Sequence, residues 1–367
     1  MSTKVGIIGL PNVGKSTLFN ALTSQTIEVH NYPFTTIQPN IGYALINDSR
    51  LTFLSSLFKP KKTTYASLTF FDIAGLVKGA SKGEGLGNEF LSHIRECDVL
   101  LHVVRVFKNE QIIHVENEIN PKNDIEIINL ELIYRDLETV EKRLQKIETK
   151  AQLAKDKKLL EEVRALHFFK ENLLLGKTLR QLDLNDEQKF FARRTLFLLT
   201  IKPLLYIANI SIDDLFNLEQ NTLYQHVLDI ALLEKSEVIP LALELEAQLS
   251  LLNDVEKEDF MNEWQIKELS LSKIIQSSFR LLNLLTFFTV GEEECRAWTI
   301  NKQKTAYDGA GLIHSDIQKG FIKAEVYTYN DIVTYKSELA IKEAGKLKIE
   351  GRNYLIKDGD VIYYRFR

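Results

Sequence analysis

Short, largely apolar runs recur along most of the chain and alternate with stretches of helical character. The runs lie at residues 5–8, 67–72, 99–104, 202–209 and 237–242. Runs of this length are typical of strands that are buried on both faces in a parallel sheet. Residues 17–22 and 90–97 have the pattern of helices between such strands. The pattern therefore predicts an α/β fold.

Between residues 130 and 175 the pattern changes to that of paired helices. Apolar residues recur there at alternating spacings of three and four, which is typical of a coiled-coil seam: Leu130, Ile133, Leu137, Val140, Leu144, Ile147 and Ala151. A polar turn at residues 154–158 separates this run from a second one at residues 159–175. The pattern predicts an inserted antiparallel helical hairpin, which is either a solvated structural arm or a partner-binding arm.

The last module, residues 287–367, is predicted to contain several short strands. Strand patterns occur at residues 296–300, 324–327 and 361–364, and turn signals separate them. Basic residues and tyrosines are interleaved here: Lys319, Lys323, Lys336, Lys342, Lys346, Lys348, Arg352 and Lys357, with Tyr327, Tyr329, Tyr335 and Tyr354. This composition favours either RNA contact or an ordinary solvated surface.

Residues 9–16, Gly-Leu-Pro-Asn-Val-Gly-Lys-Ser, match the P-loop pattern G-x-x-x-x-G-K-[ST]. The loop follows a predicted strand and precedes a predicted helix, which is the context that the motif requires. Its backbone N–H groups and the helix dipole would hold phosphates. We expect Lys15 to reach the β- and γ-phosphates and Ser16 to bind Mg²⁺.

Two downstream stretches have the features of nucleotide-sensing switches. Residues 30–39 form an irregular loop whose Thr36, preferred over Thr35, would bind Mg²⁺, unless the loop only turns the chain. Asp72 ends a predicted strand and begins D-x-x-G, so it would reach the Mg²⁺ shell directly or through water. The amide of Gly75 would then meet the γ-phosphate.

The chain after Asp72 is rich in glycine, which favours a segment whose order depends on the γ-phosphate. Leu76 stands where many switch GTPases carry a glutamine that orients water. Because leucine cannot do this, hydrolysis needs another group, a partner or a bound cation. His114 is a candidate for that group; a surface or packing histidine is the alternative interpretation.

The predicted strand that ends at Asn209 continues into Ile210-Ser211-Ile212. Guanine-specific proteins carry Asn-Lys-x-Asp at this point, and the carboxylate binds the guanine edge. Ile212 removes that carboxylate and with it the reason to prefer guanine. We expect Asn209 to hydrogen-bond the base edge and Ile210 to pack on the base.

Composition adds a few constraints. A chain of 367 residues predicts two or three domains. The net charge of −4 excludes an overall basic coat for nucleic acid, although not a local patch. Cys97 and Cys295 are too few for a disulfide framework, which fits a reducing cytoplasm. We expect no signal peptide, and no apolar run approaches the roughly 18–20 residues of a membrane span.

Together these stretches resemble the YchF group of Obg-like ATPases over nearly the whole chain. Six stretches carry the resemblance: residues 9–17, 31–40, 72–88, 103–105, 288–300 and 311–324. The most specific feature is the combination of Asp-Ile-Ala-Gly-Leu-Val-Lys-Gly-Ala at residues 72–80 with Arg-Ala-Trp-Thr-Ile at residues 296–300.

The resemblance implies a GTPase-like domain, an inserted coiled-coil arm and a TGS domain of ubiquitin-like β-grasp form. We expect these at residues 1–127 with 200–284, at 128–199 and at 285–367. It also implies a preference for ATP over GTP, slow Mg²⁺-dependent hydrolysis, and association with the ribosome, through its large subunit or the whole particle, and with rRNA. We expect a cytoplasmic monomer with no membrane or DNA partner.

In that family the residue at the place of Leu76 is also hydrophobic. Asn12 resembles the pattern of potassium-assisted P-loop enzymes, so a K⁺ ion near the phosphates would supply charge stabilisation. The chain departs from the family at five positions, which usually hold Glu, Cys, an acid, Pro and a basic residue: Ile212, Thr35, Gln38, Tyr307 and Leu347.

We therefore interpret the chain as an ATPase switch of the translation machinery. The expected nucleotide-binding residues are Asn12, Val13, Gly14, Lys15, Ser16, Thr17, Asn209 and Ile210. The expected metal ligands are Ser16, Thr36 and Asp72, and the expected catalytic residues are Lys15, Gly75 and His114. Two rivals remain: a GTPase for ribosome assembly, and a ribosome- or RNA-binding adaptor with ATP as a passive ligand, which Leu76 favours.

The P-loop assignment gives a first test. The substitution Lys15→Ala should abolish ATP binding or turnover, because it removes the ammonium group that neutralises the phosphates. ATP binding and phosphate release measure the effect, and unchanged turnover would contradict the assignment.

Overall fold

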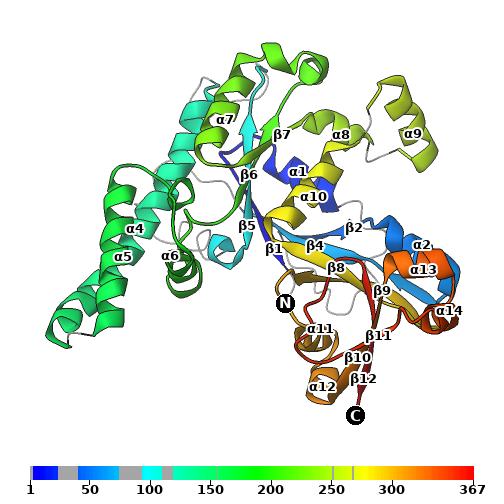
Figure 1. Cartoon of the computed structure of the whole chain (residues 1–367). Helices are drawn as coiled ribbons and strands as arrows, with labels where there is room; N and C mark the ends of the chain where they lie inside the picture. Colours follow the sequence, from blue (N-terminus) through cyan, green and yellow to red (C-terminus); the bar gives the residue numbers. More distant parts are fainter. Residues whose placement is uncertain are drawn as a thin grey trace. The chain divides into compact units, whose positions relative to one another are not determined.

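The computed structural model describes residues 3–23, 40–73, 93–109, 119–154, 156–249, 252–266 and 268–367. These residues form two compact units (Figure 1). The P-loop unit comprises Thr3–Gly42 and Thr69–Ile274, and the C-terminal unit comprises Tyr43–Leu68 and Ile275–Arg367. No helix of the described residues is long and apolar enough to cross a membrane.

A six-stranded sheet carries the P-loop and confirms the predicted α/β class. Its strands, in spatial order, are β2 (Ile41–Ile46), β4 (Ala66–Asp72), β1 (Lys4–Ile8), β5 (Val99–Arg105), β6 (Leu204–Asn209) and β7 (Glu237–Leu241). The pairs from β4 to β7 are all parallel. Because parallel strands end at the same edge, the residues after β1, β4, β6 and β7 gather there.

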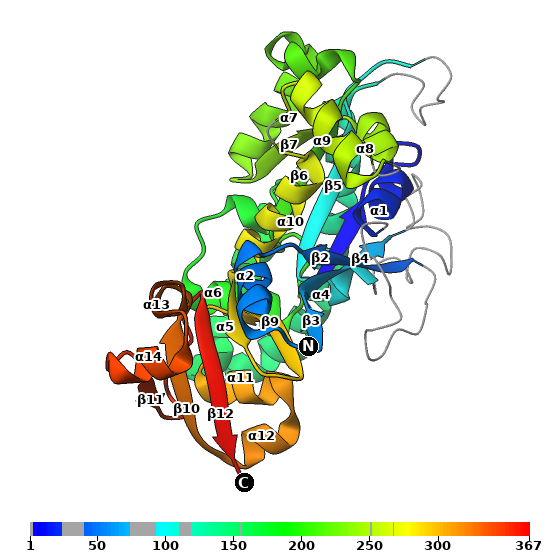
Figure 2. The same ribbon diagram turned by 90° about the vertical axis from the view of Figure 1, so that its right-hand side faces the viewer.

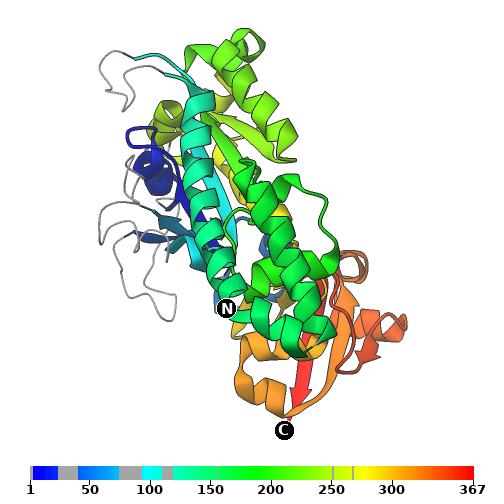
Figure 3. The ribbon, with the colours of Figure 1, turned by 90° about the vertical axis from the view of Figure 1, so that its left-hand side faces the viewer.

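Helices cover both faces of this sheet, which explains why every residue of β5 and β6 is buried. The helix α4 (Pro121–Ala154) crosses one face (Figure 3). Helices α1 (Lys15–Thr23) and α8 (Leu243–Leu249) lie on the opposite face (Figure 2). Further α-helices in the described residues of this unit include α5 (Lys157–Leu174), α6 (Asp186–Phe190), α7 (Thr222–Leu233) and α9 (Asp254–Glu263), and α10 (Ser270–Leu281) begins in it.

The helices α4 and α5 confirm the two predicted helical runs. Ion pairs between Arg143 and Glu162 and between Glu141 and Lys170 fit antiparallel helices, because the earlier residue of α4 pairs with the later residue of α5. The seam from Ile133 to Ala151 is buried or partly buried, mostly against α5 and the chain after it. Leu130 is 51% exposed, so its inclusion in the seam was wrong. The apolar contact begins about one turn later than the sequence pattern suggests.

A buried carboxylate fixes the chain that leads from α5 to β6. Asp136 of α4 accepts hydrogen bonds from the backbone N–H groups of Leu199 and Thr200, at 2.7 and 2.8 Å, and from the Thr200 hydroxyl at 2.6 Å. Burial raises the pKa of Asp136 to about 6, and these donors oppose the rise. The three hydrogen bonds offset part of the free-energy cost of burying a carboxylate at this position.

A second buried acid, Glu234 at the end of α7, joins α4 and the chain after α5 to the sheet. Its carboxylate accepts from the Tyr206 hydroxyl of β6 at 2.7 Å and from the Asn129 amide of α4 at 2.8 Å. Arg180, after α5, lies 3.1 Å from the same carboxylate and donates to Asn129. Both members of this buried pair also form hydrogen bonds with neighbouring groups, which reduces the cost of burying the charges.

The C-terminal unit is a second six-stranded sheet with helices on both faces. Its strands, in spatial order, are β11 (Lys348–Glu350), β10 (Phe321–Thr328), β12 (Asp360–Phe366), β8 (Leu284–Thr289), β9 (Glu294–Asn301) and β3 (Lys62–Thr64). Its helices are α2 (Ser49–Phe58), α11 (Ala306–Ile313), α12 (Ser315–Lys319), α13 (Tyr329–Tyr335) and α14 (Glu338–Glu343). Two hydrophobic clusters pack on the sheet, one including α11 and the other α2, α13 and α14.

The segment Tyr43–Leu68 belongs to this unit, which the sequence pattern did not indicate. Strand β3 pairs in parallel with β9, and α2 places Leu51 and Leu54 in the hydrophobic cluster. Arg50 donates to Asp48 and to Asp358, at 2.8 and 2.6 Å. The segment is thus held by backbone pairing, apolar packing and a partly buried ion pair.

The four tyrosines that suggested RNA contact are packing residues in this unit. Tyr327 is 3% exposed and donates to Glu338, so the prediction that it faces RNA is wrong. The partly buried Tyr354 donates to Asp360. Two more pack against the second cluster: Tyr329 and Tyr335.

The hydrogen bonds of Asp136 lead to a stability prediction. Asp136→Asn should lower the free energy of unfolding by about 2–4 kcal/mol, because the amide nitrogen meets donors and leaves one of them unsatisfied in the interior. Urea titration measures the effect. Asp183→Asn is the matched control, since that carboxylate is fully exposed and should change stability by less than about 0.5 kcal/mol. Equal stability of the two variants would contradict this account.

Candidate functional site

The main chain between β1 and α1 turns sharply at the edge of the first sheet. Gly9 and Gly14 have φ angles of 148° and 106°, and Asn12 has a φ of 62°. A Cβ atom at Gly9 would lie 2.5 Å from the Val103 carbonyl oxygen of β5. Both glycines are therefore required, each by its φ and by the close contacts that a Cβ atom would make.

Lys15 is the first residue of α1, and its side chain folds back over the loop. It is 7% exposed, and its Nζ donates to the Leu10 carbonyl oxygen at 2.7 Å. Burial lowers the pKa of Lys15 to about 8, and the nearby carboxylate of Asp72 opposes this. A desolvated ammonium group therefore stands over the mouth of the loop, where an anion would find little competing water.

The register of the sheet brings Asp72 to the P-loop. Asp72 of β4 is level with Ile7 of β1, and its Oδ2 accepts from the Ser16 hydroxyl at 2.8 Å. Its Oδ1 is buried and has no hydrogen-bond partner in the part of the chain that the structure describes. Such an orphaned carboxylate oxygen beside a hydroxyl is a suitable hard-oxygen donor set for Mg²⁺.

The pair Ser16 and Asp72 is the only candidate metal site that the predictions place in the described residues. Within those residues no group of three or more His, Cys, Asp or Glu side chains is arranged to hold a metal ion. A site with one carboxylate and one hydroxyl suits Mg²⁺, which keeps several waters and substrate phosphates as its other ligands.

Asn209 connects the end of β6 to the P-loop. Its amide nitrogen donates to the Val13 carbonyl oxygen at 2.9 Å in a buried bond. A Cβ atom at Gly14 would lie 2.9 Å from that nitrogen and 2.6 Å from Leu243 Cδ1 of α8. The amide of Asn209 therefore braces the loop, a role that sequence reasoning missed because the motif indicates only base recognition.

The contacts of a base with Asn209 and Ile210 stay predictions. Ile210 is 3% exposed, and its backbone N–H donates to the Leu241 carbonyl oxygen of β7 at 3.0 Å. Three other predicted site residues lie outside the described residues: Thr36, Gly75 and His114. Leu76 lies outside them as well.

Arg105, at the end of β5, is a further buried charge near this edge. Its guanidinium donates to the carbonyl oxygens of Phe107 and Asn109, at 3.2 and 3.0 Å, and lies 4.7 Å from the Phe107 ring centroid. These bonds fix the chain as it leaves the sheet. One signal in the sequence could have indicated this residue, since an arginine directly follows the largely apolar run that predicts a strand at residues 99–104.

The described site has the chemistry of an anion cradle. It combines a loop rich in positive φ angles, a helix N-terminus, one desolvated ammonium and a hydroxyl–carboxylate pair. The loop and helix would hold phosphate oxygens, and the carboxylate would hold a divalent ion against them. The arrangement suits a nucleotide with a polyphosphate tail.

Comparison with known sequence families agrees with this geometry. A family described as a 50S ribosome-binding GTPase matches residues 4–136. The C-terminal family of the YchF GTPases, described as a protein of unknown function (DUF933), matches residues 284–367.

Relatives match the whole chain. Proteins named ribosome-binding ATPase YchF from Escherichia coli O157:H7 and Bacillus subtilis are 47% and 46% identical to it, cover all of it, and are themselves covered over 99% and 100% of their lengths. A solved structure of the Schizosaccharomyces pombe YchF GTPase is 35% identical and has a TM-score of 0.87, and the match covers 99% of this chain and 98% of that one.

The lowered pKa of Lys15 predicts a pH dependence of nucleotide affinity. Binding of a triphosphate requires the protonated ammonium, which is mostly present at pH 7 and about one tenth populated at pH 9 if the pKa is about 8. The dissociation constant for Mg·ATP should therefore rise about tenfold between pH 7 and pH 9. Calorimetric titration measures it, with circular dichroism as a control for folding. Affinity that is flat over this range would contradict a titrating Lys15.

Proposed function

This chain belongs to the YchF family of P-loop nucleotide hydrolases, and from that premise we infer that it is a ribosome-binding ATPase. The observation that carries the inference is the convergence of Lys15, Ser16 and Asp72 on one glycine loop, in a chain that matches the named relatives from end to end. The reaction is the transfer of the γ-phosphoryl group of ATP to water, which depends on positioning and charge stabilisation.

We propose that residues Asn12 to Thr17 grip the phosphates through backbone N–H groups and the Lys15 ammonium. On nucleotide binding Lys15 exchanges the Leu10 carbonyl for phosphate oxygens, which recovers the interaction energy that its burial costs. Asn209 keeps Val13 in place while this exchange occurs. The loop is thus organised before the nucleotide arrives.

Mg²⁺ is the proposed metal, with Ser16, Thr36 and Asp72 as its protein ligands. When bound, the ion would neutralise charge on the β- and γ-phosphates. Ser16 and Asp72 support this proposal because their oxygens already adjoin, and one carboxylate oxygen has no described partner. Asp72 is able to act directly or through a water molecule.

The attacking water needs an assisting group other than the usual glutamine, which Leu76 replaces. We propose a K⁺ ion near Asn12, the amide of Gly75 and the imidazole of His114 as the assisting groups. Asn12 supports the first of these, since it lies within the P-loop and is exposed.

We propose that the nucleotide site prefers ATP to GTP. The curated relatives are named as ATPases, whereas the fission yeast protein of known structure is called a GTPase. Ile212 supports ATP, because it leaves no carboxylate at the position that binds the guanine edge. A GTPase that acts in ribosome assembly is the rival that this reasoning disfavours.

The proposed partner is the ribosome, through its large subunit or the whole particle, with rRNA as part of the contact. The relatives' name supports ribosome binding. A monomeric state, a cytoplasmic location and the absence of DNA and membrane partners remain predictions from the sequence. So does the assignment of residues 285–367 to a TGS domain, of residues 128–199 to an arm and of the remainder to the nucleotide-binding domain.

One experiment separates these proposals. ATP and GTP hydrolysis should be measured with and without ribosomes, each in Na⁺ and in K⁺. We expect ATP to be the better substrate and K⁺ to raise turnover about tenfold or more, since a fixed cation stabilises transition-state charge. Asn12→Ala should lose the K⁺ effect and retain ATP binding.

Each other outcome identifies a rival. Faster GTP hydrolysis would favour the assembly GTPase. Negligible turnover of both nucleotides, even with K⁺ and ribosomes, would favour an adaptor for which ATP is a passive ligand. In that case Thr36→Ala would leave ribosome association unchanged.

A further inference from the structure

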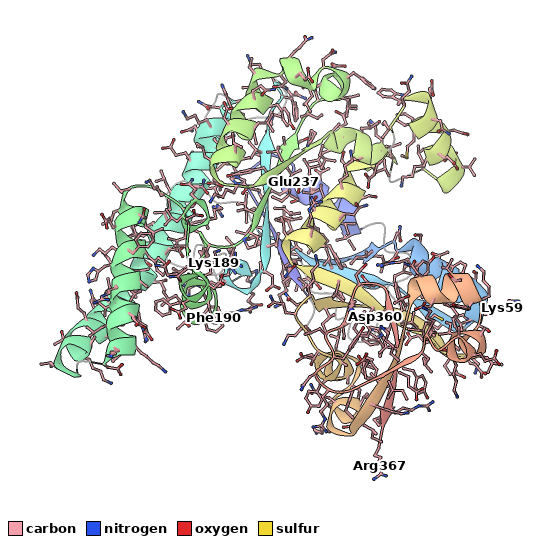
Figure 4. All side chains as sticks on the ribbon, in the orientation of Figure 1. Lys59, Lys189, Phe190, Glu237, Asp360 and Arg367 are labelled. Atoms are coloured by element: carbon pink, nitrogen blue, oxygen red, sulfur yellow. The ribbon has the colours of Figure 1, made fainter. Side chains whose placement is uncertain are left out.

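An exposed aromatic and basic turn follows α6, beside the hairpin of α4 and α5 (Figure 4). We refer to residues 189–197 as the α6 turn. Phe190 is 66% exposed and Phe197 is 54% exposed. Exposed aromatic side chains that stand within one short turn are candidates for contact with a partner.

The backbone of the α6 turn is irregular but firmly held. Phe191–Thr195 form one turn of π-helix, in which the Leu196 N–H donates to the Phe191 carbonyl oxygen. Phe197 then has a φ of 52°, which is strained for an aromatic residue. Such turns and strained residues are frequent at functional sites, because folding alone does not favour them.

The underside of the turn fixes this geometry. Ala192 and Leu196 are buried in the hydrophobic cluster of the arm, and the ring of Phe191 stacks on Phe169 with centroids 6.4 Å apart. A capping box formed by Asn185 and Gln188 fixes the start of α6. The exposed side chains are therefore presented by a rigid support rather than by a loose loop.

Positive charge accompanies the aromatic rings. Arg193 and Arg194 follow Phe190 by three and four positions, in the π-helical turn that comes directly after it. Both residues are exposed, although partial burial and the neighbouring Arg194 lower the pKa of Arg193, and in the described part of the chain neither guanidinium makes an ion pair or a hydrogen bond. Lys189 adds a third exposed cation. The only acids of α6, Asp186 and Glu187, stand in its first turn, where the helix dipole favours them.

We propose that the α6 turn is an RNA contact, in which unpaired bases of rRNA stack on Phe190 and Phe197 and phosphates pair with Arg193 and Arg194. This inference rests on the proposed ribosome binding. Aromatic faces next to unpaired guanidiniums are the chemistry that recognises single-stranded RNA. RNA is favoured over a protein partner because three clustered cations complement a phosphate backbone.

The test compares variants of the full-length protein. Phe190→Ala and the double variant Arg193→Ala/Arg194→Ala alter the turn. Leu153→Ala and Arg164→Ala are matched controls, since both residues are exposed and lie on α4 and α5. Sedimentation with purified ribosomes and filter binding to protein-free rRNA, at several salt concentrations, measure affinity. Urea titration of each variant verifies folding.

We expect Phe190→Ala to weaken rRNA binding at least about fivefold with an unchanged salt dependence, because a stacked base is lost. The double variant should weaken it about tenfold or more. It should also reduce the slope of log affinity against log salt by about 1.4, if each arginine neutralises one phosphate. Phe190→Tyr should retain affinity, and the two controls should stay within about twofold of the wild type.

The outcomes separate this inference from the proposed function. If the wild type binds ribosomes and the variants bind equally well, the α6 turn is not the contact and the proposed function stands. If the variants lose ribosome binding but no protein binds free rRNA, the partner is a ribosomal protein and the RNA inference is overturned. If the wild type does not bind ribosomes at all, the proposed function itself fails.

Discussion

The hydrogen bond from the Asn209 amide to the Val13 carbonyl is the interaction on which the nucleotide site depends. The loop between β1 and α1 has three residues with positive φ, so its own conformation gives it little stability. Asn209 restrains it from the side, and Gly14 is small enough to let that amide approach. Only a loop held in this way can present its backbone N–H groups to phosphate before the phosphate arrives.

The same sheet edge explains why one lysine and one aspartate complete the site. Parallel pairing places Asp72 level with Ile7, so the carboxylate lies one hydrogen bond from Ser16. Lys15 is close enough for this carboxylate to oppose the effect of burial on its pKa. Burial thus makes the site attractive to an anion and a divalent ion together, because each group lacks the solvent that would otherwise satisfy it.

Buried acids perform a different task where α4 and the chain after α5 meet the first sheet. Asp136 and Glu234 are each satisfied by several donors, which come from segments far apart in the sequence. The directionality of these bonds fixes how α4 and the chain after α5 meet the sheet, which apolar packing alone does less specifically. The α6 turn projects from this fixed base, so its exposed rings keep a defined orientation.

The sequence by itself determined the elements whose signal is local: the P-loop, the buried strands, the two long helices and the association of Asp72 with the loop. Periodicity and motif carry this information in neighbouring residues, and the fold class and family followed from the same stretches. Tertiary structure decided what depends on distant residues, such as the pairing of β3 with β9 more than 200 residues away. The sequence pattern favoured RNA contact by Tyr327, but the structure buries this residue in the core. Its hydroxyl group can be buried because it donates a hydrogen bond to Glu338. Phe190 has an apolar character that favours burial, and only the packing of Phe191 beneath the turn leaves its ring in solvent.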